Sequence, residues 1–503
     1  MRLHELADRY RDNASAVVVE IDSTGRRREV THRRLHDLAV LYAERLTAAG
    51  VRPGHVVGIR AANGIDWVLW DLAAMMSGAV LKAFADETVI GDPGEFVTRH
   101  GLALLVTDAE VPSGHPALVR PDGVPGVDVV PADAPRGEPG DLHSLVFSSG
   151  TSGLLKGLNV SRKGTEYVIS RFIECFGVGA EDRHVIFLPL SNYQQRLSVY
   201  CCLWIGADVV LAPYQRIFGV VRDERPTFLI APPVFYDTAL QLFHKTGGDS
   251  LGDFLGGGIR FMITGMAPIR RETLEAYWAQ GVRLLEAYGM TESGMIAWNT
   301  QEEHRLGSVG KLIDPEAVTF LPDGELLVHR PAPLSTGYFD TAGAADETYR
   351  PDGTIVTGDY GTLDDDGFLT LLGRKKDVIV LDSGRKVHPA EVESLFADVE
   401  GVVELLVVPT PRAGRLGAIV TPADPKDDAL IFSIRERIEK INQSLESHRR
   451  ITSLVFSDRP LRNDPRYMTA NLKLSRPLAA AYFAEAAQAK RPEQPERAAE
   501  HGR

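Results

Sequence analysis

Short apolar runs that alternate with amphipathic helical patterns are the feature that most limits the fold of this chain. From residue 142 onward such runs follow one another as "LHSLVFSS", "HVIFLPL", "GADVVLAP", "PTFLIAPP", "GIRFMITG" and "VRLLEAYG". Nearly continuous apolar strands are typical of parallel sheets whose two faces are both covered by helices. The alternation therefore predicts an α/β fold with a large N-terminal domain of helix-covered sheets.

The pattern changes near residue 320, where turn-separated strand segments such as "GELLVHRPAPLSTGYFD" replace the alternation. A smaller α+β segment begins after "GRKKD", with a helix in "HPAEVESLFADV", a strand in "GVVELLVVPT" and a long charged helix in "SIRERIEKINQSLESHRR". The boundary therefore lies close to Gly373–Asp377. The sequence predicts an N-terminal domain over 1–373, a small C-terminal domain over 374–480 and a flexible, Ala/Glu/Pro-rich tail over 481–503.

Charge and cysteine content narrow the function classes. The 503 residues carry a formal net charge of −13, which argues against a general nucleic-acid binder because such a protein presents a basic face. The three cysteines, Cys175, Cys201 and Cys202, have neither metal-ligand spacing nor the even number of a disulfide framework. The N-terminal stretch lacks the apolar core of a signal peptide, and no run approaches membrane-spanning length. We expect a cytoplasmic protein with no membrane span and no nucleic-acid partner.

The stretch "LVFSSGTSGLLKGLNV" gathers hydroxyls, glycines and one lysine directly after an apolar run. Hydroxyl groups, free backbone N–H groups and the cation Lys156 together suit a phosphate. The stretch differs from the Walker pattern, because Leu155 stands where the second glycine is needed, so a P-loop NTPase is disfavoured. By itself such a loop is more often a flexible connection, and other segments must decide.

Further segments occur along the chain in a fixed order. They are "LPLSNYQQR", "TGMAPI", "EAYGMTES", "GSVGKL", "GELLVHR", "TGDYG", "GRKKDVIVLDSGRKVHPAEVE" and "MTANLKLSR". Together with "SSGTSGLLKG" they resemble the adenylate-forming superfamily of acyl-CoA synthetases, nonribosomal-peptide adenylation domains and luciferases. The segments "LPLSNYQQR" and "TANLKLSR" are closest in style to the long-chain acyl-CoA synthetase branch.

The resemblance implies activation of a carboxylate, which is a poor electrophile. A carboxylate must become an anhydride before a thiol or an amine can attack it, and ATP supplies the leaving group when the carboxylate attacks its α-phosphorus. Mg²⁺, hydrogen-bond donors and at least one cation stabilise the crowded negative charge. The resemblance thus implies an ATP- and Mg²⁺-dependent, AMP-forming ligase that adenylates a carboxylic acid. The acyl group would pass to CoA, or to the phosphopantetheine thiol of a carrier protein.

Roles for single residues follow from the resemblance, position by position. Thr291 would donate to the α-phosphate, Glu292 would hold Mg²⁺ together with Thr151, and Lys156 would supply the cation of the phosphate loop. Tyr288 would lie against the adenine, and Asp359 would accept from the ribose hydroxyls beside Arg374. The full set of implied nucleotide contacts is Ser148, Ser149, Gly150, Thr151, Ser152, Gly153, Gly265, Ala287, Tyr288, Gly289, Asp359 and Arg374.

The resemblance also implies a moving C-terminal domain. Lys376 falls at the family's hinge, about which that domain rotates. Lys473 matches the lysine that the domain brings beside the α-phosphate and the reacting carboxylate, where a cation would stabilise charge in the transition state. Read without the resemblance, each is a solvated surface lysine.

The segment that borders the acyl pocket in the family departs from the family pattern here. Asn192 replaces the usual His, Gln194 replaces an aromatic residue and Gln195 replaces Glu, whereas Arg196 is kept. Buried amides are costly against a long alkyl chain, so a pocket formed by Asn192, Tyr193, Gln194 and Arg196 favours a small, polar or aromatic acid. The inference holds only if these amides face the pocket.

Two alternatives to the acid–thiol ligase stay open at this point. The adenylate could pass to an amine, or the activated group could be an unusual oxyanion such as nitrite. A non-catalytic module that only binds nucleotide is the third reading. The joint presence of Lys156, Thr291, Glu292, Asp359 and Lys473 argues against it.

Overall fold

The computed structural model describes residues 1–110, 117–122, 141–149, 155–340, 347–410, 415–468 and 474–489, and these form two compact units. The first unit comprises Met1–Thr319, Leu327–Thr357 and Leu363–Thr370. The second comprises Phe320–Leu326, Gly358–Thr362 and the described residues from Leu371 onward. The α/β fold class predicted from the sequence is confirmed, and the domain boundary at residue 373 stays a prediction.

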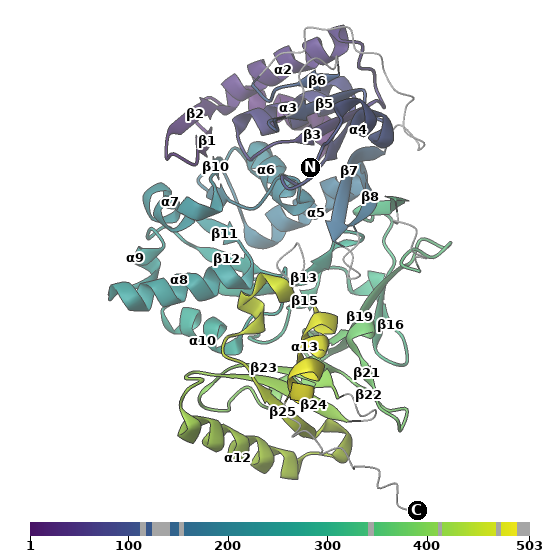
Figure 1. Cartoon of the computed structure of the whole chain (residues 1–503). Coiled ribbons are helices and arrows are strands. Elements are labelled where there is room, and N and C mark those ends of the chain that lie inside the picture. The colour runs from purple at the N-terminus through teal and green to yellow at the C-terminus, as the bar shows by residue number, and fades with distance from the viewer. Residues whose placement is uncertain are drawn as a thin grey trace, which may run out of the picture. The chain divides into compact units, whose positions relative to one another are not determined.

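A nine-stranded sheet forms the centre of the first unit (Figure 1). Its strands β1, β10, β9, β11, β12 and β13 run parallel, whereas β2, β14 and β15 are antiparallel to their neighbours. In spatial order they are β15 (Lys311–Leu312), β14 (Gly294–Trp298), β13 (Leu284–Met290), β12 (Phe261–Thr264), β11 (Phe228–Ile230), β9 (Arg183–Ile186), β10 (Asp208–Leu211), β1 (Val17–Ile21) and β2 (Arg27–Thr31).

Helices connect the strands of this unit. Glycines in the left-handed conformation end several of them, for example Gly177 after α5 and Gly206 after α6. The helices are α1 (Leu6–Arg11), α2 (His32–Ala48), α3 (Ile65–Ser77), α4 (Pro93–His100), α5 (Arg162–Phe176), α6 (Tyr193–Ile205), α7 (Ile217–Glu224), α8 (Pro233–Thr246), α9 (Leu251–Phe254) and α10 (Arg271–Ala279).

The central strands of the nine-stranded sheet, such as β11 and β12, are buried on both faces. Phe228, Phe261 and Ile263 belong to an apolar cluster that contains residues of α5 and α6. Their neighbours Leu229 and Met262 belong to a second cluster, which contains residues of α7, α8 and α10. Because side chains alternate along a strand, a strand that is covered on both faces is apolar at nearly every position. This explains the continuous apolar runs of the sequence.

A second sheet of the first unit has seven strands and carries the glycine-rich hairpin. Strands β7 and β8 pair antiparallel (Figure 1), and β18, from far along the chain, pairs antiparallel with β8. In spatial order the strands are β18 (Ser335–Asp340), β8 (Leu155–Ser161), β7 (Leu142–Ser149), β4 (Val80–Ala83), β3 (Val56–Arg60), β5 (Leu104–Thr107) and β6 (Leu118–Val119).

The second unit is built on a three-stranded sheet with its own apolar core. Its elements are β21 (Ile379–Val380), β22 (Lys386–Val387), α11 (Pro389–Ser394), β23 (Val402–Pro409), β24 (Leu416–Pro422), α12 (Asp428–Ser444), β25 (Ile451–Phe456) and α13 (Arg476–Ala489). A further sheet contributes residues to both units, in the order β16 (Val318–Phe320), β17 (Glu325–Val328), β19 (Ile355–Leu363) and β20 (Leu369–Arg374).

The start of the predicted tail needs correction. Residues 481–489 belong to helix α13, and the side chain of Phe483 is fully buried. Phe483 packs in an apolar cluster with Leu406, Ile419 and Val455 of the three-stranded sheet, and this burial keeps the segment helical. The sequence was misleading because its composition, rich in Ala and Glu, hides one large apolar anchor. Residues 490–503 lie outside the described residues.

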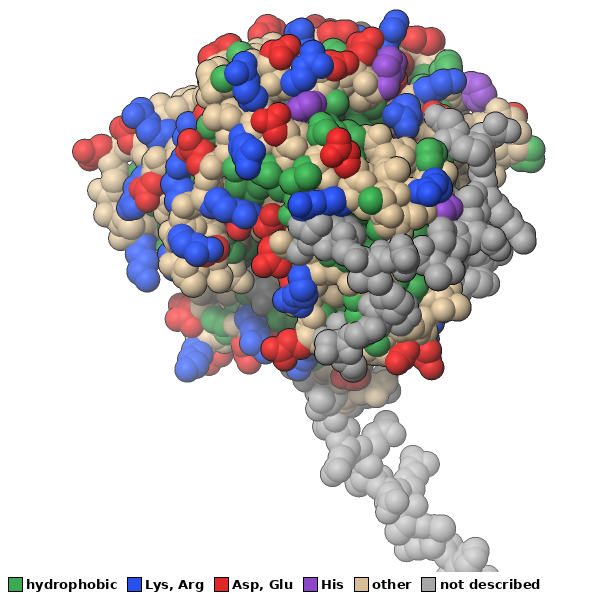
Figure 2. Space-filling view, turned by 90° about the horizontal axis from the view of Figure 1, so that it is seen from above, with side chains coloured by type: hydrophobic (Ala, Val, Ile, Leu, Met, Phe, Trp, Pro, Cys, Tyr) green, Lys and Arg blue, Asp and Glu red, His purple; other side chains and the backbone are tan. Residues whose placement is uncertain are grey.

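Charged side chains of both signs are spread over the face shown in Figure 2. Lys and Arg side chains lie there among Asp and Glu side chains, rather than in a single basic stripe of the coloured residues. Within the described parts of the chain, no helix is both long enough and apolar enough to cross a membrane.

One ion pair is buried completely in the first unit. Arg196 on α6 donates from Nε to Asp71 Oδ2 on α3 at 3.0 Å, and from Nη1 to the hydroxyl of Ser144 on β7 at 2.6 Å. The hydroxyl of Tyr200 donates to Asp71 at 2.6 Å and accepts from Arg196 at 2.9 Å. The network therefore joins two helices and a strand of the seven-stranded sheet through polar contacts that satisfy one another.

Arg196→Met should lower the free energy of unfolding by roughly 3–5 kcal/mol, because Asp71 would then be a buried charge without its partner. The double variant Arg196→Met/Asp71→Asn should recover part of this loss, since no net charge stays buried. Chemical denaturation followed by circular dichroism measures both. An equal loss in the single and double variants would contradict this account of the pair.

Candidate functional site

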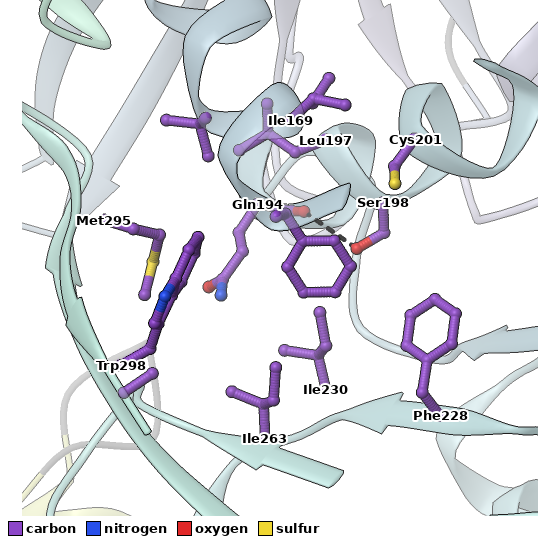
Figure 3. A pocket seen from close by; sticks show the side chains of 13 residues that line it. Ile169, Gln194, Leu197, Ser198, Cys201, Phe228, Ile230, Ile263, Met295 and Trp298 are labelled. Carbon is purple, nitrogen blue, oxygen red and sulfur yellow. Dashed lines mark hydrogen bonds between the residues drawn. The ribbon is translucent and has the colours of Figure 1, made fainter. Parts of the chain in front are cut away.

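A cavity opens in the first unit between the helices α5 and α6 and the strands β11, β12, β13 and β14 of the nine-stranded sheet (Figure 3). Its empty space, counted with its open mouth, is about 580 Å³. Its walls are mostly apolar, with Ile169, Phe172, Phe228, Ile263, Met295 and Trp298 among the lining residues. A cavity of this kind suits an apolar group that includes a ring.

Polar side chains in the cavity are few. Gln194 extends from α6 toward the strands, with Met295 and Trp298 beside it (Figure 3). Ser198, one turn further along α6, donates its hydroxyl to the backbone carbonyl of Gln194 at 3.5 Å. Cys201 also lines the cavity, and burial raises the pKa of its thiol to about 12, which keeps the thiol protonated.

Only one residue of the predicted acyl pocket lines this cavity. Asn192 caps the N-terminus of α6, accepting from Gln194 N at 3.2 Å, and its side chain is exposed. Tyr193 is buried and shares a 2.6 Å hydrogen bond with the Thr165 hydroxyl. Arg196 is held in the ion pair with Asp71, away from the cavity lining. The polar substitutions therefore bring one amide, that of Gln194, to the cavity rather than several.

The turn between β13 and β14 carries Thr291 and Glu292. Glu292 accepts at Oε1 from the hydroxyl of Tyr338 on β18 at 2.7 Å, and its backbone carbonyl accepts from Ser335 N at 2.9 Å. Lys156 of β8 places its Nζ 4.9 Å from the ring centroid of Tyr338. The fold thus brings Lys156, Glu292 and Tyr338 together from three separate segments, although Tyr338 was not among the residues predicted.

The phosphate loop itself is only partly described. Ser148 pairs with Lys156, and Ser149 with Leu155, in the register of the β7–β8 hairpin. The predicted contacts Gly150, Thr151, Ser152 and Gly153 lie outside the described residues.

Of the predicted nucleotide contacts, Gly265 directly follows β12, and Ala287, Tyr288 and Gly289 lie on β13. A Cβ added to Gly265 would come within 2.6 Å of the Ala287 carbonyl oxygen, and one added to Gly289 within 2.8 Å of the Gly294 carbonyl oxygen, so each position requires glycine. Tyr288, which directly precedes Gly289 in the sequence, is buried. The buried hydroxyl of Thr264, directly before Gly265, has no hydrogen-bond partner among the described residues. This unsatisfied donor, together with the close backbone approach, fits a site for a polar ligand such as a nucleotide base.

The predicted ribose contacts belong to the second unit. Arg374 Nε lies 3.0 Å from Asp359 Oδ1, so the two are paired as expected, and Asp359 is almost fully buried. Lys375 donates from Nζ to the buried Glu325 at 2.7 Å. The exposed Lys376, the predicted hinge, lies in the 3₁₀ turn Lys375–Asp377. The predicted catalytic Lys473 lies outside the described residues.

A preformed metal cage is absent from the described residues, which contain no group of three His, Cys, Asp or Glu side chains arranged to hold a metal. Mg²⁺ rarely uses such a cage, because it is usually bound by one or two carboxylates together with substrate phosphates and water. The Glu292 carboxylate, oriented by Tyr338, fits that kind of site.

Two titratable residues near these elements were not predicted. Glu286 on β13 accepts from Gly307 N at 2.8 Å, and burial raises the pKa of its carboxyl to about 7. Lys82 on β4 places its Nζ 4.7 Å from the ring centroid of Phe339 and 5.6 Å from that of Phe147, and burial lowers its pKa to about 8. A lysine inside the apolar run "AVLKAF" was the only sequence signal for either of them.

These features define an enzyme of the adenylate-forming class, and comparison with known proteins identifies its family. The profile of the family described as AMP-binding enzyme matches residues 3–339. The profile of the AMP-binding enzyme C-terminal domain matches residues 376–489. The chain therefore belongs to the AMP-binding enzyme family, which confirms the resemblance seen in its motifs.

Individual relatives are identical to this chain at about a quarter of the aligned residues. A 3-[(3aS,4S,7aS)-7a-methyl-1,5-dioxo-octahydro-1H-inden-4-yl]propanoyl:CoA ligase of Rhodococcus jostii is 26% identical over 460 residues, covering 81% of this chain and 88% of that one. A feruloyl-CoA synthase of an Amycolatopsis species is 27% identical over 450 residues, covering 83% and 89%. The fold is similar to that of ATP-bound MatB from Rhodopseudomonas palustris, with a TM-score of 0.76 at 22% identity over 96% of this chain and 99% of that one.

The raised pKa of Glu286 predicts a pH-dependent stability. Between pH 4.5 and 7 the folded protein keeps a proton on Glu286 that the unfolded chain has released, so this group destabilises the fold increasingly as pH rises. Glu286→Gln cannot ionise, and its stability relative to the original protein should rise by roughly 1–3 kcal/mol from pH 5 to pH 8. Melting of the ligand-free protein at several pH values measures this.

The matched control is Glu302→Gln, at an exposed position of the loop after β14. The stability difference between this variant and the original protein should stay constant over the same pH range. A Glu286→Gln difference that also stays constant would show that Glu286 is already ionised at low pH in the folded protein.

Proposed function

We propose that this protein adenylates a carboxylic acid with ATP and transfers the acyl group to the thiol of CoA. The observation that carries the proposal is the position of the apolar cavity. Its wall includes Ala287 of β13 and Met295 of β14, the two strands joined by the turn of Thr291 and Glu292. An acyl group in this cavity would have its carboxylate near the residues assigned to the α-phosphate and the metal.

Each residue of the proposed site would have a separate role. Glu292 would hold Mg²⁺, with Tyr338 donating to one carboxylate oxygen and so fixing its orientation. Mg²⁺ supplies charge neutralisation on the phosphate oxygens when bound. Lys156 would add a cation on the phosphate side, and the Thr291 hydroxyl would donate to the α-phosphate. Asp359 would accept from the ribose hydroxyls, with Arg374 holding its carboxylate in place.

The lining of the cavity supports a ring-bearing acid as the substrate. Phe172, Phe228 and Trp298 offer flat aromatic surfaces, and the carbon-rich walls would leave a small dianionic acid without partners. The Gln194 amide offers one hydrogen-bonding group to a polar substituent on the ring. The names of the two relatives above, an octahydroindenyl-propanoyl ligase and a feruloyl synthase, support the same class.

The acceptor and the setting of the reaction are also part of the proposal. CoA is favoured because both named relatives are CoA ligases by name. The phosphopantetheine arm of a carrier protein has the same terminal thiol and is the alternative acceptor. We also place the reaction in the cytoplasm.

A panel of acids tests the proposal through release of pyrophosphate in the presence of CoA. We expect kcat/KM for benzoate- or cinnamate-like acids to exceed that for malonate and for palmitate by about tenfold or more, since apolar pockets discriminate on this scale. Hydroxylamine and nitrite are included to detect amine transfer or oxyanion activation. A better kcat/KM for palmitate than for every ring acid would contradict the substrate class, and no turnover of any acid would contradict the ligase.

Lys473→Ala should impair adenylation selectively. The resemblance places its cation where charge develops at the α-phosphate, and losing one such group costs about 10²- to 10³-fold. Transfer to CoA from a supplied acyl-adenylate should survive, because that step does not need the charge. Single-turnover assays of each half-reaction measure both, with Lys440→Ala on the exposed face of α12 as the control. Equal losses in both assays would mean that Lys473 supports folding or general binding.

A further inference from the structure

The motif "GELLVHR" ends in Arg330, for which neither the resemblance nor the cavity provides a role. Arg330 follows β17 and is only 6% exposed. A guanidinium cannot lose its proton in a protein, so a buried one must be compensated by acceptors or by an opposite charge. The partners of Arg330 therefore indicate why the residue is there.

The partners of one guanidinium nitrogen are backbone carbonyls of the turn region. Arg330 Nη1 donates to the carbonyl oxygen of Ser293 at 3.2 Å and to that of Met295 at 2.6 Å. These two carbonyls flank Gly294, which has a left-handed φ of +82°. Ser293 directly follows Thr291–Glu292, so Arg330 fixes the chain on the carboxyl side of the two residues assigned to phosphate and metal.

The charge of Arg330 is balanced by Asp314. Arg330 Nε lies 2.9 Å from Asp314 Oδ2, and the Tyr167 hydroxyl donates to the same carboxylate. The guanidinium carbon also lies 5.5 Å from the ring centroid of Tyr167. Tyr167 belongs to α5, and the next residue, Val168, lines the cavity. The ion pair thus connects the turn to a helix of the cavity wall.

One feature of this arrangement separates it from an ordinary structural ion pair. The Nη2 group of Arg330 is buried and has no hydrogen-bond partner among the described residues. An unsatisfied buried donor is costly, and an apolar side chain of similar length would avoid that cost. The contacts of Arg196, by contrast, are all with side chains of the core. A residue kept at such a cost is expected at a functional site rather than in a scaffold.

We propose that Arg330 is a positioning residue for the nucleotide and metal site. By holding the Ser293 and Met295 carbonyls, it keeps Glu292 in one orientation and Met295 in the cavity wall. Tyr338 and Ser335 hold Glu292 from the other side. The proposal rests on the proposed function, because the turn matters only if it binds ATP and Mg²⁺.

Calorimetric titration of ATP, with and without Mg²⁺, tests this role without any acid substrate. The main variant is Arg330→Met/Asp314→Asn, which removes both buried charges together. We expect the gain in ATP affinity on adding Mg²⁺ to fall by about 10- to 100-fold, the usual effect of losing a residue that orients a metal ligand. The affinity for ATP without Mg²⁺ should stay within about threefold, because a selective loss distinguishes positioning from a general loss of structure.

The control removes another ion pair of the same unit. Arg260→Met/Asp182→Asn breaks a pair, 2.8 Å apart, at the opposite end of β12, and should leave the Mg²⁺ gain unchanged. If Arg330→Met/Asp314→Asn fails to fold by circular dichroism, Arg330→Lys decides. Lysine keeps the charge but cannot reach both carbonyls and Asp314, so about a three- to tenfold smaller gain is expected.

The outcomes separate the two proposals. An unchanged Mg²⁺ gain in the folded double variant, or in Arg330→Lys if that variant has to decide, would overturn the role of Arg330 and leave the ligase standing. An equal loss in the control pair would likewise overturn it, since any buried ion pair would then have the same effect. If the original protein bound no ATP at all, the proposed function would fail, and the role of Arg330 with it.

Discussion

Burial of both faces of the central strands in the nine-stranded sheet is the constraint on which the site of this protein depends. Strands covered on both faces are mostly apolar along their length, so most polar groups of the candidate site lie where the strands end. The central strands are parallel, and their carboxyl ends therefore meet at one edge of the sheet. Gly265 follows β12 and the turn of Thr291 and Glu292 follows β13, so the candidate site forms at that edge.

The two buried arginine–aspartate pairs of the first unit differ in what else the arginine contacts. Arg196 and Asp71 form a closed pair whose remaining bonds go to Ser144 and Tyr200, and the result joins helices to a strand. Arg330 has a carboxylate partner too, but its Nη1 group serves backbone carbonyls. The first pair could be replaced in principle by apolar groups of the same shape, whereas no apolar side chain could donate to those carbonyls.

The sequence predicted the strands of the central sheet well, because buried parallel strands appear in a sequence as continuous apolar runs. It also named Asp359 and Arg374 together, because the motifs were read by position, and the two side chains are paired in the structure; their role toward the ribose stays a prediction. It could not tell which way a polar side chain points. Asn192 looked like a pocket residue but caps a helix, since both uses need only a short polar side chain before an apolar run. The pKa shifts of Glu286 and Lys82 come from burial by residues that are distant in the sequence, and no local sequence pattern reveals that burial.

The wall of the cavity illustrates this limit most sharply. Met295 and Trp298 both line the cavity, although residues three apart in a regular strand point to opposite faces. The register of β13 and β14 resolves the conflict: Tyr288 pairs with Ala297, but Gly289 pairs with Met295, so Ile296 is an extra residue in β14. This β-bulge reverses the alternation once, and the side chains on either side of it then share a face. A strict alternating pattern would have assigned Met295 and Trp298 to opposite faces of β14. Only one of the two side chains would then have lined the cavity.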